Sequence, residues 1–408
     1  MEQVSEIGAA VHIIMTRLAH KLREAADSFP EVGLRSVAHS VCDDLERYAV
    51  QFDRLDDSRS IALKEKTDRI EGRVGLGKGG KGRGQRESAS AHRAAFAATR
   101  PGVIVPKKCL HKLQGHESGV RCVAMLGPSR MGSASDDGVL KVWELRNEGQ
   151  PACIATLRGH KKVVWCLTGI DSLHFASGGE DRKVKVWDIA RMEIVRALEG
   201  HDQRIWSLAY LGHSRLTSGS EDRTVRIWDC HNGECLAMLS NDGFVMGLAS
   251  FGPDQFVSTS SDCTVKVWQC GSKGWACSKV LSHKDKGEVT CIARTYKHDD
   301  KLVCGCHHDV VIWDLSESKL FNTFRGHTAT IFSVAGMTGG KRVVSGSKDR
   351  SVRVWGLDPC ECLAKLHGHE QAVYGVTGIE PDLLGRCVSA SHDGTLRIWG
   401  DTLPTDEG

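Results

Sequence analysis

Apolar and polar residues alternate in short segments from about residue 109 to residue 400. Residues 120–123 alternate in this way, and residues 132–137, 139–143 and 153–157 supply three more segments. A period of two is typical of β-strands, because successive side chains point to opposite faces of a sheet. The pattern therefore predicts a group of four short antiparallel strands.

This group recurs seven times, and each copy contains one tryptophan at the end of its third segment. Successive tryptophans are 44, 41, 40, 45, 42 and 44 residues apart. We number the copies one to seven by these repeat tryptophans, which are Trp143, Trp187, Trp228, Trp268, Trp313, Trp355 and Trp399. Five copies have a Gly-His pair upstream, which ends in His116, His160, His201, His327 or His369. Six copies have an aspartate six residues before the tryptophan: Asp137, Asp181, Asp222, Asp262, Asp349 and Asp393. Because a four-stranded sheet cannot bury both faces alone, the copies are expected to stack around an axis.

The markers Gly115-His116, Asp137 and Trp143-Glu144, with their copies, resemble those of the WD40 repeat family. The resemblance covers about residues 109–400 and implies an all-β fold, a seven-bladed β-propeller. It also implies a hydrogen-bonded chain that links the Trp indole, a strand Ser, the Gly-His imidazole and the turn Asp. Such a chain satisfies buried polar groups, which makes these His and Asp residues structural rather than catalytic.

The two ends of the repeat region are complementary. The seventh copy stops after the strand of Trp399, so its fourth strand is missing from the C-terminus, while residues 109–113 supply a surplus strand before the first Gly-His. In the family that this chain resembles, such a strand completes the last blade and closes the ring. Closure would leave no exposed sheet edge of the kind that invites aggregation.

Copies four and five depart from the pattern. Copy four has Ser240-Asn241 in place of Gly-His, and copy five has Ser282-His283. The turn at residues 306–309 in copy five is one residue shorter than in the other copies. We expect these two blades to open or tilt more easily than the rest.

The first hundred residues have a different pattern. Apolar residues recur at helical spacing in two stripes, from Val4 to Leu22 and from Leu34 to Leu55, so residues 1–71 are predicted to contain a small α-helical hairpin. Two helices bury little alone, which leaves self-association, partner binding and packing on the propeller open. Residues 72–108 carry nine Lys and Arg against Glu87 alone and are rich in Gly, so a basic linker is expected, either an RNA contact or a solvated tether. Residues 401–408 are a tail.

Composition adds little beyond the class of protein. The formal net charge is +3, and no signal peptide or membrane span is recognisable, so a cytoplasmic or nuclear location without membrane association is expected. The sixteen Cys are expected to be reduced thiols packed among apolar strand residues.

Candidate chemistry is weak. The Gly-rich residues 75–82 lack the Ser or Thr that would hold Mg²⁺ in a phosphate-binding loop. Cys304, Cys306, His307 and His308 are metal-ligand types, but a tetrahedral zinc site needs more fixed ligands than this turn offers. We therefore expect no catalytic residue, no metal and no cofactor.

One set of positions is unusual. In propellers of the family that this chain resembles, the second residue of each inner strand faces the channel mouth at the end that carries the Gly-His and Asp turns. These residues are Arg121, Trp165, Trp206, Met246, Thr290, Phe332 and Tyr374. Aromatic, Met and Arg side chains are enriched at binding hot spots, although large residues could equally fill the channel mouth. Charged residues of the neighbouring turns would surround the mouth: Asp136, Glu180, Arg182, Glu221 and Arg223.

These observations predict a non-enzymatic scaffold that docks peptide segments on this face. The acidic residues favour a basic peptide slightly, unless Arg182 and Arg223 pair with them or bind an acidic or phosphorylated segment. Two alternatives remain open, a substrate receptor of a ubiquitin-ligase complex and an RNA-processing or ribosome-assembly factor that uses the basic linker.

Overall fold

The computed structural model describes residues 105–401, except residues 147–148, 283–286, 296–299, 338–340 and 380–384. Several predictions fall outside the described residues: the helical hairpin of residues 1–71, the linker up to residue 104, His283 and the tail after residue 401. In the described part of the chain, no helix is long and apolar enough to span a membrane.

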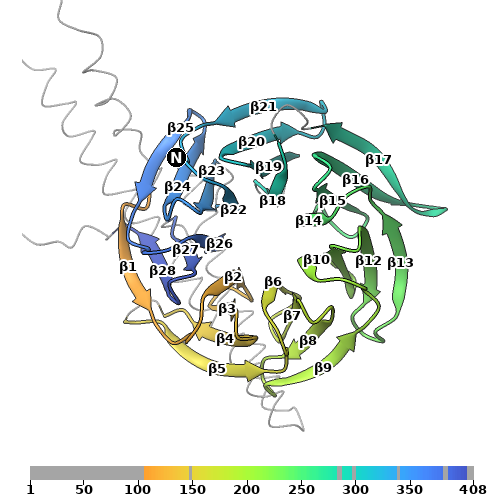
Figure 1. Cartoon of the computed structure of the whole chain (residues 1–408), viewed down its shortest axis with the longest axis horizontal. Helices are drawn as coiled ribbons and strands as arrows, with labels where there is room; N and C mark the ends of the chain where they lie inside the picture. Colours follow the sequence, from red (N-terminus) through yellow and green to blue (C-terminus); the bar gives the residue numbers. More distant parts are fainter. Residues whose placement is uncertain are drawn as a thin grey trace, which may run out of the picture. The chain divides into compact units, whose positions relative to one another are not determined.

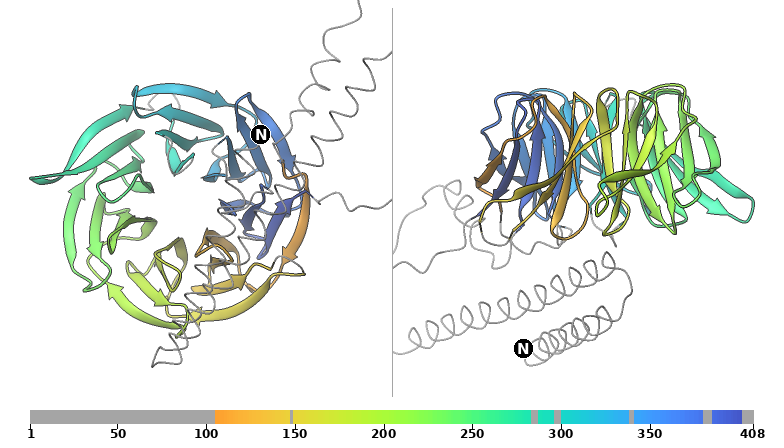
Figure 2. Two further views of the ribbon diagram at one scale, coloured as in Figure 1. Left: turned by 180° about the vertical axis from the view of Figure 1, so that it is seen from behind. Right: turned by 90° about the horizontal axis from the view of Figure 1, so that it is seen from below.

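The described residues form twenty-eight strands in seven four-stranded antiparallel sheets around one axis, the predicted seven-bladed propeller (Figure 1). The sheets stand side by side as the wall of a ring (Figure 2). Blades one to four consist of β2 (Val120–Met125), β3 (Arg130–Ser135), β4 (Val139–Glu144) and β5 (Ala152–Arg158); β6 (Val164–Gly169), β7 (His174–Gly179), β8 (Val184–Asp188) and β9 (Glu193–Leu198); β10 (Ile205–Gly212), β11 (Arg215–Ser220), β12 (Thr224–Asp229) and β13 (Cys235–Ser240); β14 (Val245–Ser250), β15 (Gln255–Ser260), β16 (Thr264–Gly271) and β17 (Gly274–Ser282). Blades five to seven consist of β18 (Val289–Arg294), β19 (Lys301–Cys306), β20 (Asp309–Asp314) and β21 (Lys319–Phe324); β22 (Ile331–Gly336), β23 (Arg342–Ser347), β24 (Val352–Leu357) and β25 (Cys360–Leu366); β26 (Val373–Gly378), β27 (Cys387–Ser391), β28 (Leu396–Gly400) and β1 (Lys108–Leu113).

The ring is closed by the two ends of the repeat region, as predicted. β1 pairs antiparallel with β28, from Lys108 opposite Gly400 to Leu113 opposite Leu396. Blade seven is therefore completed by the first strand of the chain, and its sheet has the same four-stranded order as the others.

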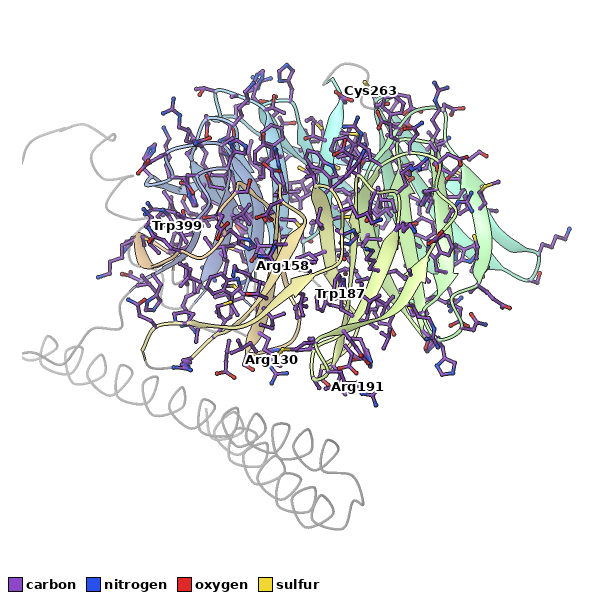
Figure 3. All side chains as sticks on the ribbon, turned by 60° about the horizontal axis from the view of Figure 1, so that its bottom comes forward. Arg130, Arg158, Trp187, Arg191, Cys263 and Trp399 are labelled. Carbon is purple, nitrogen blue, oxygen red and sulfur yellow. The ribbon has the colours of Figure 1, made fainter. Side chains whose placement is uncertain are left out.

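Each sheet is buried by packing against the sheets on either side. One core cluster, for example, joins Leu126 and Val142 of blade one to Phe175 and Trp187 of blade two. Trp187 is 1% exposed, and the ring of Phe175 stacks on it with centroids 6.1 Å apart. Burying a side chain such as Phe175 stabilises the fold by about 1.5–3 kcal/mol. Figure 3 shows Trp187 and Trp399 inside the wall of the ring.

The ring has two distinct ends. The Gly-His loops and the Asp turns lie together at the end that we call the turn face, because backbone bonds join each loop to a turn, as from Glu221 N–H to the carbonyl of Arg204 (3.0 Å). Figure 3 labels Cys263, in the turn between β15 and β16, at this end, and Arg130 and Arg191 at the opposite end.

The predicted chain of side-chain hydrogen bonds is complete in four blades. In blade three, Trp228 Nε1 donates to Ser218 Oγ (2.8 Å), which lies 2.7 Å from Nε2 of His201, and Nδ1 of His201 lies 2.6 Å from Asp222. A neutral imidazole satisfies every group when it donates from Nδ1 to the carboxylate. Burial would raise the pKa of Asp222, but hydrogen bonds from His201 and Thr224 outweigh it and hold that pKa well below its usual range. The same four-residue chain occurs in blades two, six and seven.

Blade one lacks the last link, which the sequence pattern did not predict. His116 Nε2 lies 2.7 Å from Ser133 Oγ, but Nδ1 of His116 is buried without a partner among the described residues. Burial, together with the charge of Lys141, lowers the pKa of His116 to about 4, so this imidazole is neutral at neutral pH.

Blades four and five are incomplete, in agreement with their departures from the pattern. In blade four, Trp268 Nε1 still donates to Ser258 Oγ (2.8 Å), but both side-chain polar atoms of the buried Asn241 are without partners among the described residues. In blade five, Val303 occupies the position of the serine, so it offers no hydroxyl to the blade's tryptophan.

Candidate functional site at the channel mouth

Each of the seven predicted mouth residues is the extra residue of a β-bulge. In blade one, Val120 pairs with Ser135 and Cys122 pairs with Ala134, so the ladder between β2 and β3 skips Arg121. The other inner strands break register in the same place, which leaves out Trp165, Trp206, Met246, Thr290, Phe332 and Tyr374. A bulge bends its strand and re-aims the side chain, and bulges are common next to functional sites.

All seven residues line one cavity of about 470 Å³ on the inner strands of the ring. Each of them is half-buried. The structure thus brings together the whole set that the sequence pattern selected, although their role in binding stays a prediction.

Five of the seven form a continuous stack, which we call the aromatic arc: Trp206, Trp165, Arg121, Tyr374 and Phe332. The ring centroids of Trp206 and Trp165 are 4.7 Å apart, and those of Phe332 and Tyr374 are 4.5 Å apart. The guanidinium of Arg121 joins the two pairs, at 4.8 Å from the centroid of Trp165 and 4.2 Å from that of Tyr374. Offset aromatic pairs and cation–π contacts each stabilise such a stack by about 0.5–1.5 kcal/mol.

The arc leaves blades four and five uncovered. Met246 and Thr290 occupy the mouth positions there, and neither is aromatic. The hydroxyl of Thr290 lies 2.5 Å from the carbonyl oxygen of Ile331, to which it can donate, and 3.1 Å from that of Gly305, so it is turned into the wall. The mouth is therefore asymmetric, with a broad aromatic surface on one side and small or flexible side chains on the other.

Arg121 is held in place by a carboxylate as well as by the two rings. Its Nη2 donates to Oδ2 of Asp136 (3.0 Å), its Nε donates to Oδ1, and His392 Nε2 lies 3.3 Å from the same carboxylate. Burial opposes the charge on Arg121, but the hydrogen bonds and charge of Asp136 outweigh it and raise the pKa of the guanidinium. Arg121 therefore stays charged, and the negative charge of Asp136 is balanced by Arg121 within the ring.

The other predicted charges of the rim are arranged differently from expectation. Glu221 pairs with Arg204, whose Nε lies 2.6 Å from the carboxylate and whose guanidinium lies 5.5 Å from the centroid of Trp206. For Arg182 and Arg223 the sequence left two alternatives open, and the structure does not show the first of them, pairing with these carboxylates. Both are exposed, and no carboxylate of the described residues lies within 4 Å of them. The guanidinium of Arg223 lies 5.9 Å from the ring of Phe244 instead.

Two residues beside the mouth, Arg204 and Phe244, were missed by the sequence reasoning. Phe244 is 38% exposed, beside the mouth position of blade four. Each stands directly before the first apolar residue of its inner strand. Reading one position earlier along the inner strands would have found both.

Trp165 and Trp206 each have an indole N–H that is not hydrogen-bonded to any described residue. The indole Nε1 of each is buried. An unsatisfied buried N–H destabilises a fold by about 1–3 kcal/mol, a penalty that phenylalanine at the same position would avoid.

The metal-ligand types of blade five are placed in the core. Cys304 and Cys306 are 0% and 1% exposed and pack among apolar residues such as Val289. Burial raises the pKa of Cys304 well above its ordinary value, which keeps the thiol protonated. No group of three or more potential metal ligands occurs among residues that the structure describes, and none of the cysteines in those ranges forms a disulfide.

The sequence matches a family model described as "WD domain, G-beta repeat" over six segments, which together make up more than half of the chain. The matched segments are residues 107–144, 151–188, 192–229, 233–269, 318–356 and 360–400. The interval between residues 269 and 318 contains most of blade five, the blade with the shortened turn.

Individual proteins match over shorter stretches. GID complex subunit 7 of Schizosaccharomyces pombe is 31% identical over 128 residues, which are 31% of this chain and 25% of the relative. Pre-mRNA-processing factor 19 of Bos taurus is 29% identical over 100 residues, 24% of this chain and 19% of the relative. This chain thus spans a quarter or less of the length of these relatives. The crystal structure of the WD40 β-propeller domain of Doa1 superposes with a TM-score of 0.63, at 20% identity, over 72% of this chain and 97% of that one, a likeness of fold alone.

Proposed function

The chain belongs to the WD40 repeat family, and on this basis we propose that it is a protein-interaction scaffold whose aromatic arc docks a peptide segment of a partner protein. Propellers of this family are in general scaffolds rather than enzymes. The proposal concerns the turn face of the ring, where the bulged residues of the inner strands gather around the cavity of about 470 Å³.

The aromatic arc is the observation that carries this proposal. Trp, Tyr and Arg are the side chains that most often supply binding free energy at protein interfaces. Here they are stacked in advance, with Arg121 fixed between two rings and bound to Asp136, so little side-chain freedom is left to lose on binding. A peptide side chain inserted beside the arc would meet a rigid apolar surface on one side and Met246 on the other.

The orphaned indole groups argue against a purely structural role. If Trp165 and Trp206 only filled the channel, phenylalanine would fill it without leaving two buried N–H groups unsatisfied. A tryptophan that lowers stability is typical of positions where the larger aromatic surface serves binding.

The test is affinity purification of the full chain followed by mass spectrometry, with the variant Trp165→Ala/Trp206→Ala. The recovery of partner proteins should fall at least tenfold, because truncating a hot-spot residue weakens the binding free energy by about 2 kcal/mol or more. The matched control is Leu236→Ala/Met238→Ala on β13. These two residues are 50% and 58% exposed and lie outside the mouth.

Circular dichroism and the melting temperature of each variant establish that it is folded. A folded mouth variant that keeps every partner of the wild type would refute the proposal. Trp165→Phe/Trp206→Phe should melt no lower than the wild type, because it removes both orphaned donors.

Two other roles remain compatible with a scaffold. The name of GID complex subunit 7 identifies that relative as part of a multi-subunit assembly. This likeness supports the alternative that this chain is the substrate receptor of a ubiquitin-ligase complex. Recovery of a ligase adaptor that depends on residues 1–71 would support it. The name of pre-mRNA-processing factor 19 favours an RNA-processing role. That role predicts RNA binding that falls steeply with salt and disappears when residues 72–86 are deleted.

A further inference from the structure

We propose that the peptide docked at the mouth carries an anionic side chain, a carboxylate or a phosphoserine, which binds in a cleft between blades two and three on the turn face. This inference rests on the proposed function and adds the charge of the ligand and a second subsite. The slight preference for a basic peptide that the sequence suggested is thereby reversed.

The cleft is a separate hollow of about 480 Å³, formed by the loop before β6, the turn between β7 and β8 and the loop before β10. Six cationic side chains line it against three carboxylates, Glu180, Asp181 and Asp202. The cations are Lys161, Lys162, Arg182, Lys183, Lys185 and Arg204. An excess of cations in a concave polar site raises the local concentration of anions.

Three of the cations already have carboxylate partners. Asp181 lies 2.9 Å from His160 and 3.6 Å from Lys185, so its charge belongs to the hydrogen-bonded chain of blade two. Lys183 pairs with Glu199 at 2.5 Å, and Arg204 pairs with Glu221 at 2.6 Å.

The remaining cations are exposed and available. No carboxylate of the described residues lies within 4 Å of Lys161, Lys162 or Arg182, and all three are exposed. Glu180 and Asp202 are the only carboxylates of the lining that are likewise left without an ion pair in the part of the chain that the structure describes. Three cations against two carboxylates are therefore free to meet a ligand, an excess of one positive charge, and Arg offers a planar pair of donors to a carboxylate or a phosphate.

The backbone conformation at Arg182 is common to several turns of the ring. Arg182 has a φ of 65°, in the left-handed region, and the same turn position is glycine in blades one and seven, at Gly138 and Gly394. The equivalent position is arginine in blades three and six as well, at Arg223 and Arg350, so the backbone of this turn accepts either residue and Arg182 is distinguished by its place in the cleft.

A basic ligand would meet surfaces that the ring has already occupied. Asp136 is neutralised by Arg121 and Glu221 by Arg204. The aromatic faces are occupied too, because Arg121 lies over two rings of the arc and Arg204 lies over Trp206. Arg204 also lines the cleft, so the cleft adjoins the mouth, and one segment can reach both.

The experiment measures binding of the full chain to fluorescent peptide pools by polarisation. Every pool has the same degenerate flanks, enriched in Phe, Leu and Trp to fill the mouth, and one fixed residue: phosphoserine, Glu, Ser or Lys. The phosphoserine or the Glu pool should bind at least tenfold more tightly than the Ser pool, and comparing these two identifies which anion is preferred. The Lys pool should bind no better than the Ser pool. Preference for the Lys pool, or binding of no pool, would overturn the inference.

Two substitutions of opposite expected sign sharpen the test. Arg182→Gln should weaken binding of the anionic pool at least fivefold, and Glu180→Gln should strengthen it, because it removes a like charge from the cleft. The matched control is Arg350→Gln: Arg350 is exposed and occupies the equivalent turn of blade six, with a φ of 68°. The control should bind like the wild type. An equal loss in the Arg350 variant, or weaker binding in the Glu180 variant, contradicts a site in this cleft.

The mouth variant Trp165→Ala/Trp206→Ala separates this inference from the proposed function. If it binds the anionic pool like the wild type while Arg182→Gln does not, the cleft stands and the mouth fails. If it abolishes binding of a preferred Lys pool, the mouth stands and the anionic cleft fails.

Discussion

Removing the serine of a complete hydrogen-bonded chain should open one blade without affecting the others. In blade three, Ser218 is fully buried and joins Trp228 Nε1 to His201 Nε2. Ser218→Ala leaves both of these groups buried and unsatisfied. At about 1–3 kcal/mol for each group, the loss is about 2–6 kcal/mol of local stability.

Blade four offers a matched control for this substitution. Ser258 is 1% exposed and accepts the same bond from Trp268 Nε1, but no histidine follows it in the chain of hydrogen bonds. Ser258→Ala therefore orphans one group only, and should cost about 1–3 kcal/mol. The difference between the two variants measures the link to the imidazole.

The assay is native-state hydrogen exchange followed by mass spectrometry, because a repeat protein opens locally and one global free energy of unfolding does not describe it. Exchange in peptides of β10 to β13 should accelerate in the Ser218 variant by about 30-fold or more, which corresponds to about 2 kcal/mol. Peptides of blade six should be unchanged in both variants. Equal acceleration of blades three and four in their respective variants would refute the reasoning, since it would mean that the bond to His201 contributes nothing.

Two further predictions concern the incomplete blades. In the wild type, the amides of blade four should exchange faster than those of blade three. Asn241→His should slow exchange in blade four, because the histidine completes the hydrogen-bonded chain to Ser258 and Asp262, with an expected gain of about 1 kcal/mol for a new hydrogen bond. Unchanged exchange in blade four of this variant would contradict the prediction. His116 is half-buried and neutral, with a pKa of about 4, below the ordinary 6.5. As the pH falls, this histidine is therefore protonated in the unfolded chain before it is protonated in the folded one. The contribution of the neutral His116 to the free energy of unfolding is complete above pH 6.5 and is lost as the pH falls toward 4. The melting temperature of His116→Gln should consequently depend less on pH in this window than that of the wild type, and an identical pH dependence would show that His116 does not carry the effect.

The sequence was enough to predict the ring because its markers repeat in a fixed phase. Seven tryptophans at nearly constant spacing, and a surplus strand before the first Gly-His, specify the number of blades and the pairing of β1 with β28. The mouth positions followed from the same phase, since every inner strand has its bulge at the same residue.

The charge arrangement of the mouth was not predicted, because it depends on contacts between loops. In each turn, the residue before the Asp is bonded through its backbone to the residue before the inner strand. Glu221 thereby lies beside Arg204 and is neutralised, whereas Glu180 lies beside the apolar Val163 and keeps its charge available. Comparing turn residues only with their neighbours in the same turn, such as Arg182, therefore could not decide which residues pair.

The pairing of β1 with β28 has a consequence for how the chain folds. Arg397 Nη1 donates to Cys109 Sγ across 288 residues of intervening chain. Closing a loop of that length costs about 5 kcal/mol of chain entropy before any contact is gained. All other strand pairings of the described sheets join neighbours in sequence, so they can form early, while this one must wait for β26 to β28. During synthesis β1 is made before the other strands of the ring and pairs after them. Until β28 is available, β1 is an unpaired strand that can pair with another exposed sheet edge.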